Sequence, residues 1–564
     1  MEEKIRKAVA EALKHMGAPE RKFAVERPSD MSHGDYATNV AMTVAKSIGG
    51  AIGIAEKLKH ILEGELDELI TKVDVAGPGF VNITLSREAV TLAIAEANAK
   101  DEEWGAPATG NRQPATRVMV EYSNPNAFKE MHIGHLVGTV VGEALSRLIE
   151  NSGDKVARDT FGGDVGPNVA KALWGLRKKE IVNPTTAEEI GAAYTAGSNS
   201  YETDATAKVE IDEISQAIYA GTNKELMELW RKGRDVSMEE FRRVWKLLGT
   251  HFDFEFFDSD TTDIGLRVVN DGLNKNIFEK SDGAIIYNGE KKGVHTLVFI
   301  TSRGTPTYEA KDIGLAFLKE ERWPSDKIII VTGNEQAGRF KTILAALSEI
   351  APKLAEKTAH VATGFLKLAS GKMSSREGNV ITASDFIQSV IKKASEKNTD
   401  PLIAEQVAVG AIKYMILRQA PGSDIVFDEK KSLSLEGDSG PYLQYALVRA
   451  RSVLEKARSA KHSPSPIGYG GAREARNKIP KTPCRLERLI IHFPEVVARA
   501  TSELAPNLLV NYLTELAGEW NSFYARERII GGEHEAHKLL VARAFANTMS
   551  NGLALLGIPA PGKM

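Results

Sequence analysis

Apolar residues follow two patterns in the first 107 positions, one typical of a helix and one typical of strands. The opening stretch MEEKIRKAVAEALKHM is charged and periodic, as surface helices are. Residues 70–86, ITKVDVAGPGFVNITLS, alternate apolar and polar positions around Gly-Pro-Gly, which favours two strands joined by a turn. Residues 1–107 are therefore expected to form a small α+β domain, which ends in the polar linker GAPATGNRQPAT.

The next segment predicts a strand, a loop, a helix and a second strand. TRVMVEY (116–122) and KVARDTF (155–161) are short apolar runs of strand type. Two adjacent apolar stripes between them indicate a largely buried helix. The stripes consist of Leu136, Val140, Ala144, Leu148 and of Val137, Val141, Leu145, Ile149. This order is the first half of a doubly wound nucleotide-binding fold, whose ligands lie where the first strand ends and the helix begins.

A second strand-and-helix unit occurs at residues 326–350, DKIIIVTGNEQAGRFKTILAALSEI. We expect the two units to be halves of one doubly wound, Rossmann-like α/β domain over residues 108–430. Residues 178–300 combine helical patterns with a Gly-containing hairpin and are expected to be an insertion between the halves. Residues 431–564 are helical in pattern and predict an all-α helical bundle.

The composition of the chain limits the cell compartments and the classes of protein to which it can belong. With 42% apolar and 26% charged residues the chain is typical of a globular protein, and no apolar run approaches the roughly 20 residues of a membrane span. The N-terminus lacks the apolar core of a signal peptide. One cysteine, Cys484, forms no internal disulfide and no multi-cysteine zinc site. These features predict a cytoplasmic protein without membrane contact.

Charge is unevenly distributed along the chain. The net charge is −3, but residues 441–564 contain seventeen Lys and Arg against ten Asp and Glu. This basic segment is a candidate surface for a polyanion. A solvated helical face explains the count equally well.

The stretch SNPNAFKEMHIGHL (123–136) combines turn formers, a lysine and two histidines at the start of the predicted helix. His132 and His135 are three residues apart and so share a helix face, where the free N–H groups of the N-terminus also favour phosphate. Gly134 would let a nucleotide approach the backbone closely. The alternatives are a metal pair, which usually needs a third ligand, or two surface histidines.

The stretch GKMSSREGN (371–379) places Lys372 after a glycine, on a loop behind the second unit. Such a loop can close on a polyphosphate and supply positive charge to a transition state. On its own it is equally well explained as a solvated surface loop. The two motifs together, each at the edge of one half of the fold, favour nucleotide chemistry more strongly than either alone.

HIGH and KMSS resemble the two motifs of class I aminoacyl-tRNA synthetases, and their surroundings resemble the arginyl-tRNA synthetase family. The resemblance extends over essentially the whole chain. The similar segments are SHGDYATNVAM, VDVAGPGFVNITLS, VEYSNPNAFKEMHIGHL, YEAKDIG, SGPYLQYALVRARSVL and NGLALLGI.

This resemblance implies that the chain activates L-arginine with ATP to arginyl-adenylate and transfers the arginyl group to the 2′-hydroxyl of the terminal adenosine of tRNA(Arg). It implies Mg²⁺ accompanying ATP, no zinc, and a monomer. The domain over 1–107 would contact tRNA, the domain over 108–430 would be catalytic, and the helical domain over 431–564 would bind the anticodon.

The resemblance also implies roles for individual residues. The catalytic residues would be Lys129, His132, His135 and Lys372. The ATP-binding residues would be Gly134, Met373, Ser374 and Ser375. The arginine-binding residues would be Glu121, Ser123, Asn126, Tyr308, Asp312 and Gln336. Because the second lysine of the KMSKS pattern is Ser375 here, Lys129 is expected to supply the missing charge.

The chemistry of a guanidinium independently supports arginine as the amino acid, because that planar cation needs carboxylates that accept in a fork. Tyr308 and Asp312 are spaced i,i+4 and would share a helix face, with Glu121 opposite. Each acid alone is more simply a surface salt bridge. Two further hypotheses are an adenylating paralogue with another acceptor and a catalytically silent RNA-binding paralogue.

Overall fold

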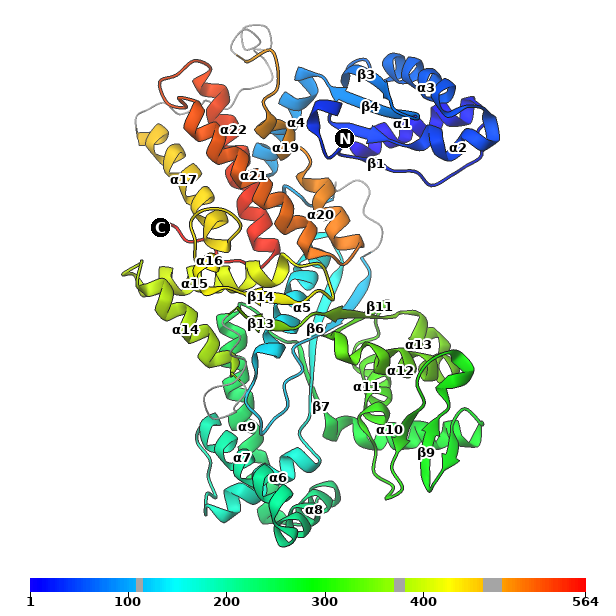
Figure 1. Ribbon diagram of the computed structural model, residues 1–564, viewed down its shortest axis with the longest axis vertical. Helices are drawn as coiled ribbons and strands as arrows, with labels where there is room; N and C mark the ends of the chain where they lie inside the picture. Colours follow the sequence, from blue (N-terminus) through cyan, green and yellow to red (C-terminus); the bar gives the residue numbers. More distant parts are fainter. Residues whose placement is uncertain (108–114, 370–380, 460–478) are drawn as a thin grey trace. The chain divides into compact units, whose positions relative to one another are not determined.

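The computed structural model describes residues 1–107, 115–369, 381–459 and 479–564 (Figure 1). These residues form two compact units. The first contains residues 1–106, 445–499 and 512–552, and the second contains residues 107–444, 500–511 and 553–564. The first unit therefore combines residues from both ends of the sequence, while the middle of the chain builds most of the second.

The N-terminal part of the first unit is an antiparallel sheet with helices, as its α+β pattern predicts. The strands follow the order β1 (Val25–Glu26), β2 (Tyr36–Thr38), β4 (Phe80–Leu85), β3 (Ile70–Ala76). The helices are α1 (Glu2–His15), α2 (Val40–Ile48), α3 (Ala51–Glu65) and α4 (Arg87–Lys100). In the hairpin β3–β4, Val75 pairs with Val81, and Val73 and Ile83 are fully buried. The alternating pattern around Gly-Pro-Gly therefore identified both the strands and their inward face.

The C-terminal residues are helical, as predicted. The helices are α17 (Gly440–Ser459), α19 (Arg485–Ile490), α20 (Phe493–Ser502), α21 (Pro506–Arg526) and α22 (Glu535–Leu555). Within the first unit, buried polar contacts join them to the N-terminal residues. Arg87 of α4 forms an ion pair with Glu487 of α19, and the Trp104 indole donates to Thr548 of α22 at 3.1 Å. Burial alone would raise the pKa of Glu487, but His537 and Arg87 lower it to about 2.

The second unit is built on a parallel five-stranded sheet. The strand order is β12 (Thr358–Thr363), β11 (Lys327–Gly333), β5 (Arg117–Glu121), β6 (Lys155–Gly162), β7 (Phe254–Phe257). The first strand in the sequence lies at the centre, and the chain adds strands to one side and then to the other. This order is that of a doubly wound sheet, so the predicted fold class is confirmed.

Helices pack on the two faces of this sheet, because strand side chains alternate between them. Val118 and Val120 of β5 share a core with α5 (Ile133–Asn151), whereas Met119 shares a core with Phe340 of α12. The helices near the latter face are α10 (Asp258–Asn274), α11 (Tyr308–Arg322), α12 (Ala337–Ile350) and α13 (Pro352–Glu356).

Further elements are inserted between the strands of the sheet. Four helices lie between β6 and β7, namely α6 (Pro167–Lys178), α7 (Ala187–Thr203), α8 (Ala205–Ala220) and α9 (Lys224–Leu247). A small antiparallel sheet between α10 and α11 consists of β8 (Glu279–Ser281), β9 (Ala284–Tyr287) and β10 (Leu297–Ile300). The range 178–300, predicted as an insertion, therefore also contains β7, the edge strand of the central sheet.

After β12, the second unit continues with helices and a two-stranded parallel sheet. The elements are β13 (Leu366–Leu368), α14 (Ala383–Ser395), α15 (Pro401–Leu417), β14 (Ile425–Phe427) and α16 (Glu429–Ser432).

Candidate active site

The loop after β5 leaves the sheet through residues in the left-handed region of backbone conformation. Ser123, Asn124 and Phe128 have φ angles of 75°, 48° and 63°. Such conformations are costly for residues other than glycine and persist only where surrounding contacts fix them. The Ser123 hydroxyl accepts a hydrogen bond from the Trp245 indole at 2.9 Å and lies 2.9 Å from the Thr139 hydroxyl of α5, whose own hydrogen goes to the His135 carbonyl at 2.7 Å. The loop is thus held at the carboxyl edge of the sheet, where ligands of doubly wound folds bind.

Two asparagine side chains bind this loop to the end of β6. The Asn124 side-chain oxygen accepts from the Phe161 backbone N–H at 2.9 Å, and that of Asn126 accepts from Gly163 at 3.0 Å. Asn124 also donates to Glu121 at 2.7 Å. Asn126 therefore fixes the backbone of the site through its oxygen, while Glu121 and Ser123 lie beside it at the strand end.

The two histidines form the N-terminus of α5. His132 caps the helix, and its Nδ1 accepts from the Gly134 N–H at 3.1 Å; Nδ1 of His135 accepts from the His132 N–H at 3.2 Å. The rings stack with centroids 3.8 Å apart. A Cβ at position 134 would lie 2.9 Å from the His132 ring, so glycine leaves room for this arrangement.

Both imidazoles are neutral near pH 7. Burial, with the neighbouring charge of Lys129, lowers the pKa of His132, and burial lowers the pKa of His135 to about 3. Because each Nδ1 accepts a backbone N–H, the proton of each neutral ring lies on Nε2. The pair therefore presents two Nε2–H donors beside a helix N-terminus, where anions bind favourably.

Two predicted sources of positive charge accompany the histidines. Lys129 is half-buried, with its ammonium 4.9 Å from the centre of the Tyr194 ring. Lys372, Met373, Ser374 and Ser375 lie outside the described residues. Ile381 and Thr382, the first residues described after them, pair with Ile133 and His132. The chain that follows the second motif thus returns to the first motif.

Asp312 of α11 lies in a cluster with Glu309, Gln336 and Arg339. The Arg339 guanidinium pairs with Asp312 and binds Glu309 at 3.0 Å and Gln336 at 3.2 Å. Its centre is 6.0 Å from the Tyr308 ring. Burial raises the pKa of Asp312 to about 7 against the lowering effect of Arg339, and the charge of Glu121 adds to the rise. Tyr308, Asp312 and Gln336, which the sequence assigned to arginine, therefore occur together.

Glu121 is buried and already paired. Lys319 of α11 contacts Glu121 at 2.5 Å and Asp159 at 2.7 Å, with all three side chains at most 2% exposed. Burial raises the pKa of Asp159 to about 7, while Lys319 opposes that rise. A buried pair of this kind depends on its partners, since removing one leaves an uncompensated charge.

Sequence reasoning missed Arg339, Glu309 and Lys319. Glu309 lies three residues before Asp312, and Arg339 three residues after Gln336, so helical spacing was the available signal. Lys319 lies seven residues after Asp312 on the same helix and gave no sign of its burial.

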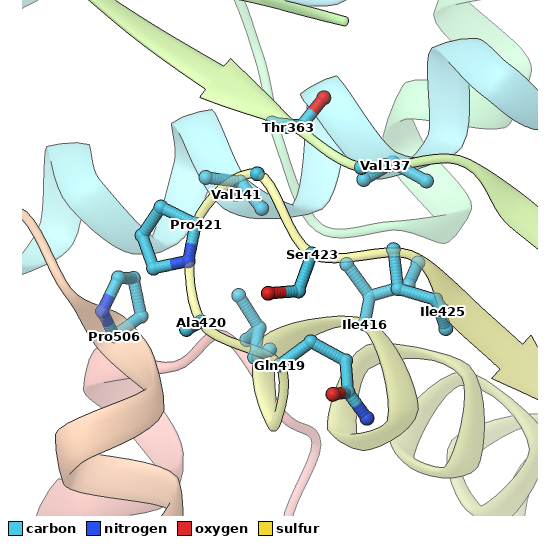
Figure 2. A pocket seen from close by; sticks show the side chains of 13 residues that line it. Val137, Val141, Thr363, Ile416, Gln419, Ala420, Pro421, Ser423, Ile425 and Pro506 are labelled. Atoms are coloured by element: carbon cyan, nitrogen blue, oxygen red, sulfur yellow. The ribbon is translucent and has the colours of Figure 1, made fainter. Parts of the chain in front are cut away.

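Two hollows in the second unit do not fit the predicted substrates. The first, of about 20 Å³, has room for about one water molecule and lies between α5 and the loop before β14. Figure 2 shows Val137 and Val141 on one side of it and Pro421 and Ser423 on the other. The second, of about 360 Å³, lies at the opposite end of α5 from the histidines, where Arg158 is already paired with Glu143 and Glu150.

Metal-binding clusters and membrane-spanning helices do not occur in the described part of the chain. No group of three or more His, Cys, Asp and Glu side chains among the described residues could hold a metal ion. Within the same residues, no helix is both long and apolar enough to cross a membrane.

Comparison with known proteins agrees with the fold and with the motifs. Residues 95–429 match the catalytic domain of class I (R) tRNA synthetases, residues 443–564 the DALR anticodon binding domain, and residues 3–85 the arginyl-tRNA synthetase N-terminal domain.

Two curated relatives are similar over almost their whole length. The arginine–tRNA ligase of Treponema denticola is 30% identical over 95% of this chain and 94% of the relative. That of Fusobacterium nucleatum is 31% identical over 94% and 93%. The solved Thermus thermophilus arginyl-tRNA synthetase superposes with a TM-score of 0.80 at 26% identity, with both chains fully covered.

Proposed function

This chain belongs to the arginyl-tRNA synthetase family, and on that premise we propose how its residues hold arginine and ATP during adenylation. The chain is an ATP-dependent ligase that joins arginine to tRNA. The comparisons do not favour an adenylating paralogue with another acceptor or a catalytically silent RNA-binding protein.

Arginine is bound at the carboxyl edge of the central sheet. Asp312, Tyr308 and Glu121 contact its guanidinium, since two carboxylates in one buried region suit a planar cation. Ser123, Asn126 and Gln336 orient the α-amino and carboxylate end. The Trp245 indole and the Thr139 hydroxyl, each 2.9 Å from the Ser123 hydroxyl oxygen, hold this side chain in place for that role.

ATP lies against the N-terminus of α5. The Nε2–H groups of His132 and His135 donate to its phosphates, Gly134 lets the nucleotide approach, and Lys129 and Lys372 supply positive charge. Met373, Ser374 and Ser375 contact ATP from the second motif. Mg²⁺ arrives with ATP, whose phosphates are its usual ligands, and it neutralises part of their charge.

Adenylation then requires mainly that the two substrates are correctly positioned and that the charge of the transition state is stabilised. A carboxylate oxygen of arginine bonds to the α-phosphorus while the bond to pyrophosphate breaks, and the tRNA 2′-hydroxyl later attacks the carbonyl carbon and releases AMP. Fixed donors that fit the transition state better than bound ATP accelerate the first step. The observation that supports this proposal is the histidine pair at the N-terminus of α5, whose Nδ1 atoms accept backbone N–H groups and so leave each Nε2–H to donate to phosphate.

Asp312→Asn tests the arginine subsite. The substitution keeps the shape of the side chain but removes the charge opposite a buried guanidinium, which costs about 3–5 kcal/mol. The KM for arginine in aminoacylation should therefore rise at least about 100-fold, with KM for ATP nearly unchanged. Glu321→Gln, at an exposed position on α11, is the matched control. A KM for arginine within a few-fold of wild type would remove Asp312 from the site.

The proposal also assigns a role to each domain, a cell compartment and an oligomeric state. Residues 1–107 contact tRNA, residues 108–430 carry the chemistry, residues 431–564 bind the anticodon arm of tRNA(Arg), and the protein acts as a cytoplasmic monomer. Burial raises the pKa of Cys484 to about 12, so this thiol is unreactive in a reducing compartment. Analytical ultracentrifugation of the free protein, which measures its mass in solution, tests the monomeric state.

A further inference from the structure

The subsite proposed for the substrate guanidinium already holds a guanidinium, that of Arg339. This side chain pairs with Asp312 through Nη2 and with Glu309 through Nε, and its Nη1 donates to Gln336. The chemical group is the same as that of the substrate, and the forked contacts are those that a guanidinium makes with carboxylates.

Other cations near this cluster are bound to different acids. Lys319 is held by Glu121 and Asp159, and Lys311 is held by Asp258 at 2.8 Å. Among the described residues, Arg339 is the cation paired with Asp312. A substrate guanidinium that binds Asp312 would therefore compete with the Arg339 side chain.

Arg339 is also placed so that it can release Asp312 and keep other partners. Its side chain is 24% exposed, whereas that of Asp312 is 9% exposed, so Arg339 is the more solvent-accessible partner of the pair. Its Nε binds Glu309 independently, and aromatic rings of Tyr308 and Phe340 lie 6.0 and 5.5 Å from its centre. An arginine stacked on such rings keeps part of its stabilisation when one carboxylate is withdrawn.

We propose that Arg339 occupies the guanidinium subsite of the substrate-free enzyme, and that substrate arginine binds by displacing it from Asp312 while Glu309 retains it. The proposal rests on the proposed function, because it takes Asp312 as the carboxylate that receives the substrate. Binding is then an exchange of one guanidinium for another.

Such an exchange reduces the apparent affinity by the fraction of molecules in which the subsite is free. If Arg339 occupies Asp312 in about 90% of molecules, its removal tightens arginine binding about tenfold. A point charge such as an ammonium cannot copy the fork, so the exchange also disfavours cations that lack a guanidinium.

The first experiment is calorimetric titration of L-arginine into the full-length enzyme at pH 8.5, where Asp312 is ionised. Arg339→Met removes the competing cation and nearly keeps the length of the side chain. We expect the Kd for arginine to fall about tenfold in Arg339→Met, and Arg339→Lys to lie between it and wild type. An unchanged or weaker affinity in Arg339→Met would overturn the proposal, because it would make Arg339 a support of the site.

The second experiment separates displacement from a structural role by using Glu309→Gln. In the wild-type background this change removes the partner that retains the displaced Arg339, so arginine binding should weaken. In the Arg339→Met background the same change should have no effect on the Kd. Equal weakening in both backgrounds would contradict the proposal, because Glu309 would then act on the substrate directly.

Asp312→Asn distinguishes failure of the subsite from failure of the displacement. If this variant keeps wild-type affinity for arginine, the proposed function of the subsite is wrong. If its affinity falls while Arg339→Met shows no gain, the subsite stands and the displacement alone is wrong.

Discussion

At the scale of single residues, the proposed ATP site depends on where its positive charges lie. Ser375 leaves the second motif without its second lysine, and Lys129 precedes His132 by three residues in a loop fixed by Ser123 and Asn126. The Tyr194 ring holds the Lys129 ammonium in place without neutralising it. A cation of this kind stabilises charge that builds up on the leaving pyrophosphate.

Lys129→Ala should lower the single-turnover rate of adenylate formation by roughly 10²–10³, as removing one transition-state donor does, with little change in KM for arginine. Ser375→Lys in that background should restore part of the rate. Lys171→Ala is the control, because Lys171 also lies over a tyrosine, Tyr201, at 4.7 Å. A Lys129→Ala rate within threefold of wild type would show that this lysine has no part in adenylation.

The protonation state of Asp312 predicts the pH dependence of arginine binding. Its pKa is raised to about 7 by burial, so the carboxylate is protonated increasingly as pH falls below 7. The kcat/KM for arginine should therefore fall about tenfold per pH unit below that point and level off above it, because kcat/KM follows groups of the free enzyme. Asp312→Asn should abolish this dependence. A wild-type kcat/KM that stays constant from pH 8 to pH 6 would show that protonation of Asp312 does not control arginine binding.

Residues of this site differ in how far the sequence predicts them. Tyr308 and Asp312 are four positions apart on one helix, so local geometry brings them together. The partners Arg339 and Asp312 come from different helices, and Lys319 meets Glu121 across 198 positions. Helical spacing relates Arg339 to Gln336 alone, and its pairing with Asp312, like that of Lys319 with Glu121, depends on how the elements pack.

Among the elements, helix α5 links the motif histidines to the core. Its two apolar stripes correctly indicated burial on nearly every side. They did not reveal that Gly142 faces the Tyr122 ring so closely that a Cβ would lie 2.2 Å from it. The short strand β7, FEFF, was missed because four residues between helices give too little alternation to recognise.

Gly142→Ala should therefore displace α5 and with it His132 and His135. We expect a decrease of about 1–3 kcal/mol in the free energy of unfolding, as for other overpacked cores, and a lower adenylation rate. Gly138→Ala on the same helix is the control, since its Cβ would have its nearest neighbours at 3.8 and 3.9 Å. Chemical denaturation of both variants compares them; equal stabilities would mean that Tyr122 moves aside freely.

On the scale of the whole molecule, the basic C-terminal residues belong to the part that matches an anticodon binding domain. Lys456 and Arg458 of α17 are exposed. In general, each phosphate that a protein cation binds releases counterions and steepens the salt dependence of nucleic-acid binding.

The double variant Lys456→Ala, Arg458→Ala should bind tRNA(Arg) more weakly, with the slope of log K against log salt reduced by about one for each phosphate that is no longer bound. The pair Lys275→Ala, Lys280→Ala removes two exposed cations from the second unit and is the control. Filter binding over a range of salt concentrations measures both slopes. Identical salt slopes in the two double variants would show that α17 is not part of the tRNA-binding surface.

The ion pair of Arg87 with Glu487 and the bond from Trp104 to Thr548 have a consequence for biosynthesis. These partners of the N-terminal segment follow it by about 400 and 444 positions in the sequence, so they are translated much later. At about 5–20 residues per second the delay is roughly 20–90 s. During that interval the nascent N-terminal segment leaves the ribosome with Arg87 and Trp104 uncovered, and chaperones that bind exposed aromatic surface have this window in which to act.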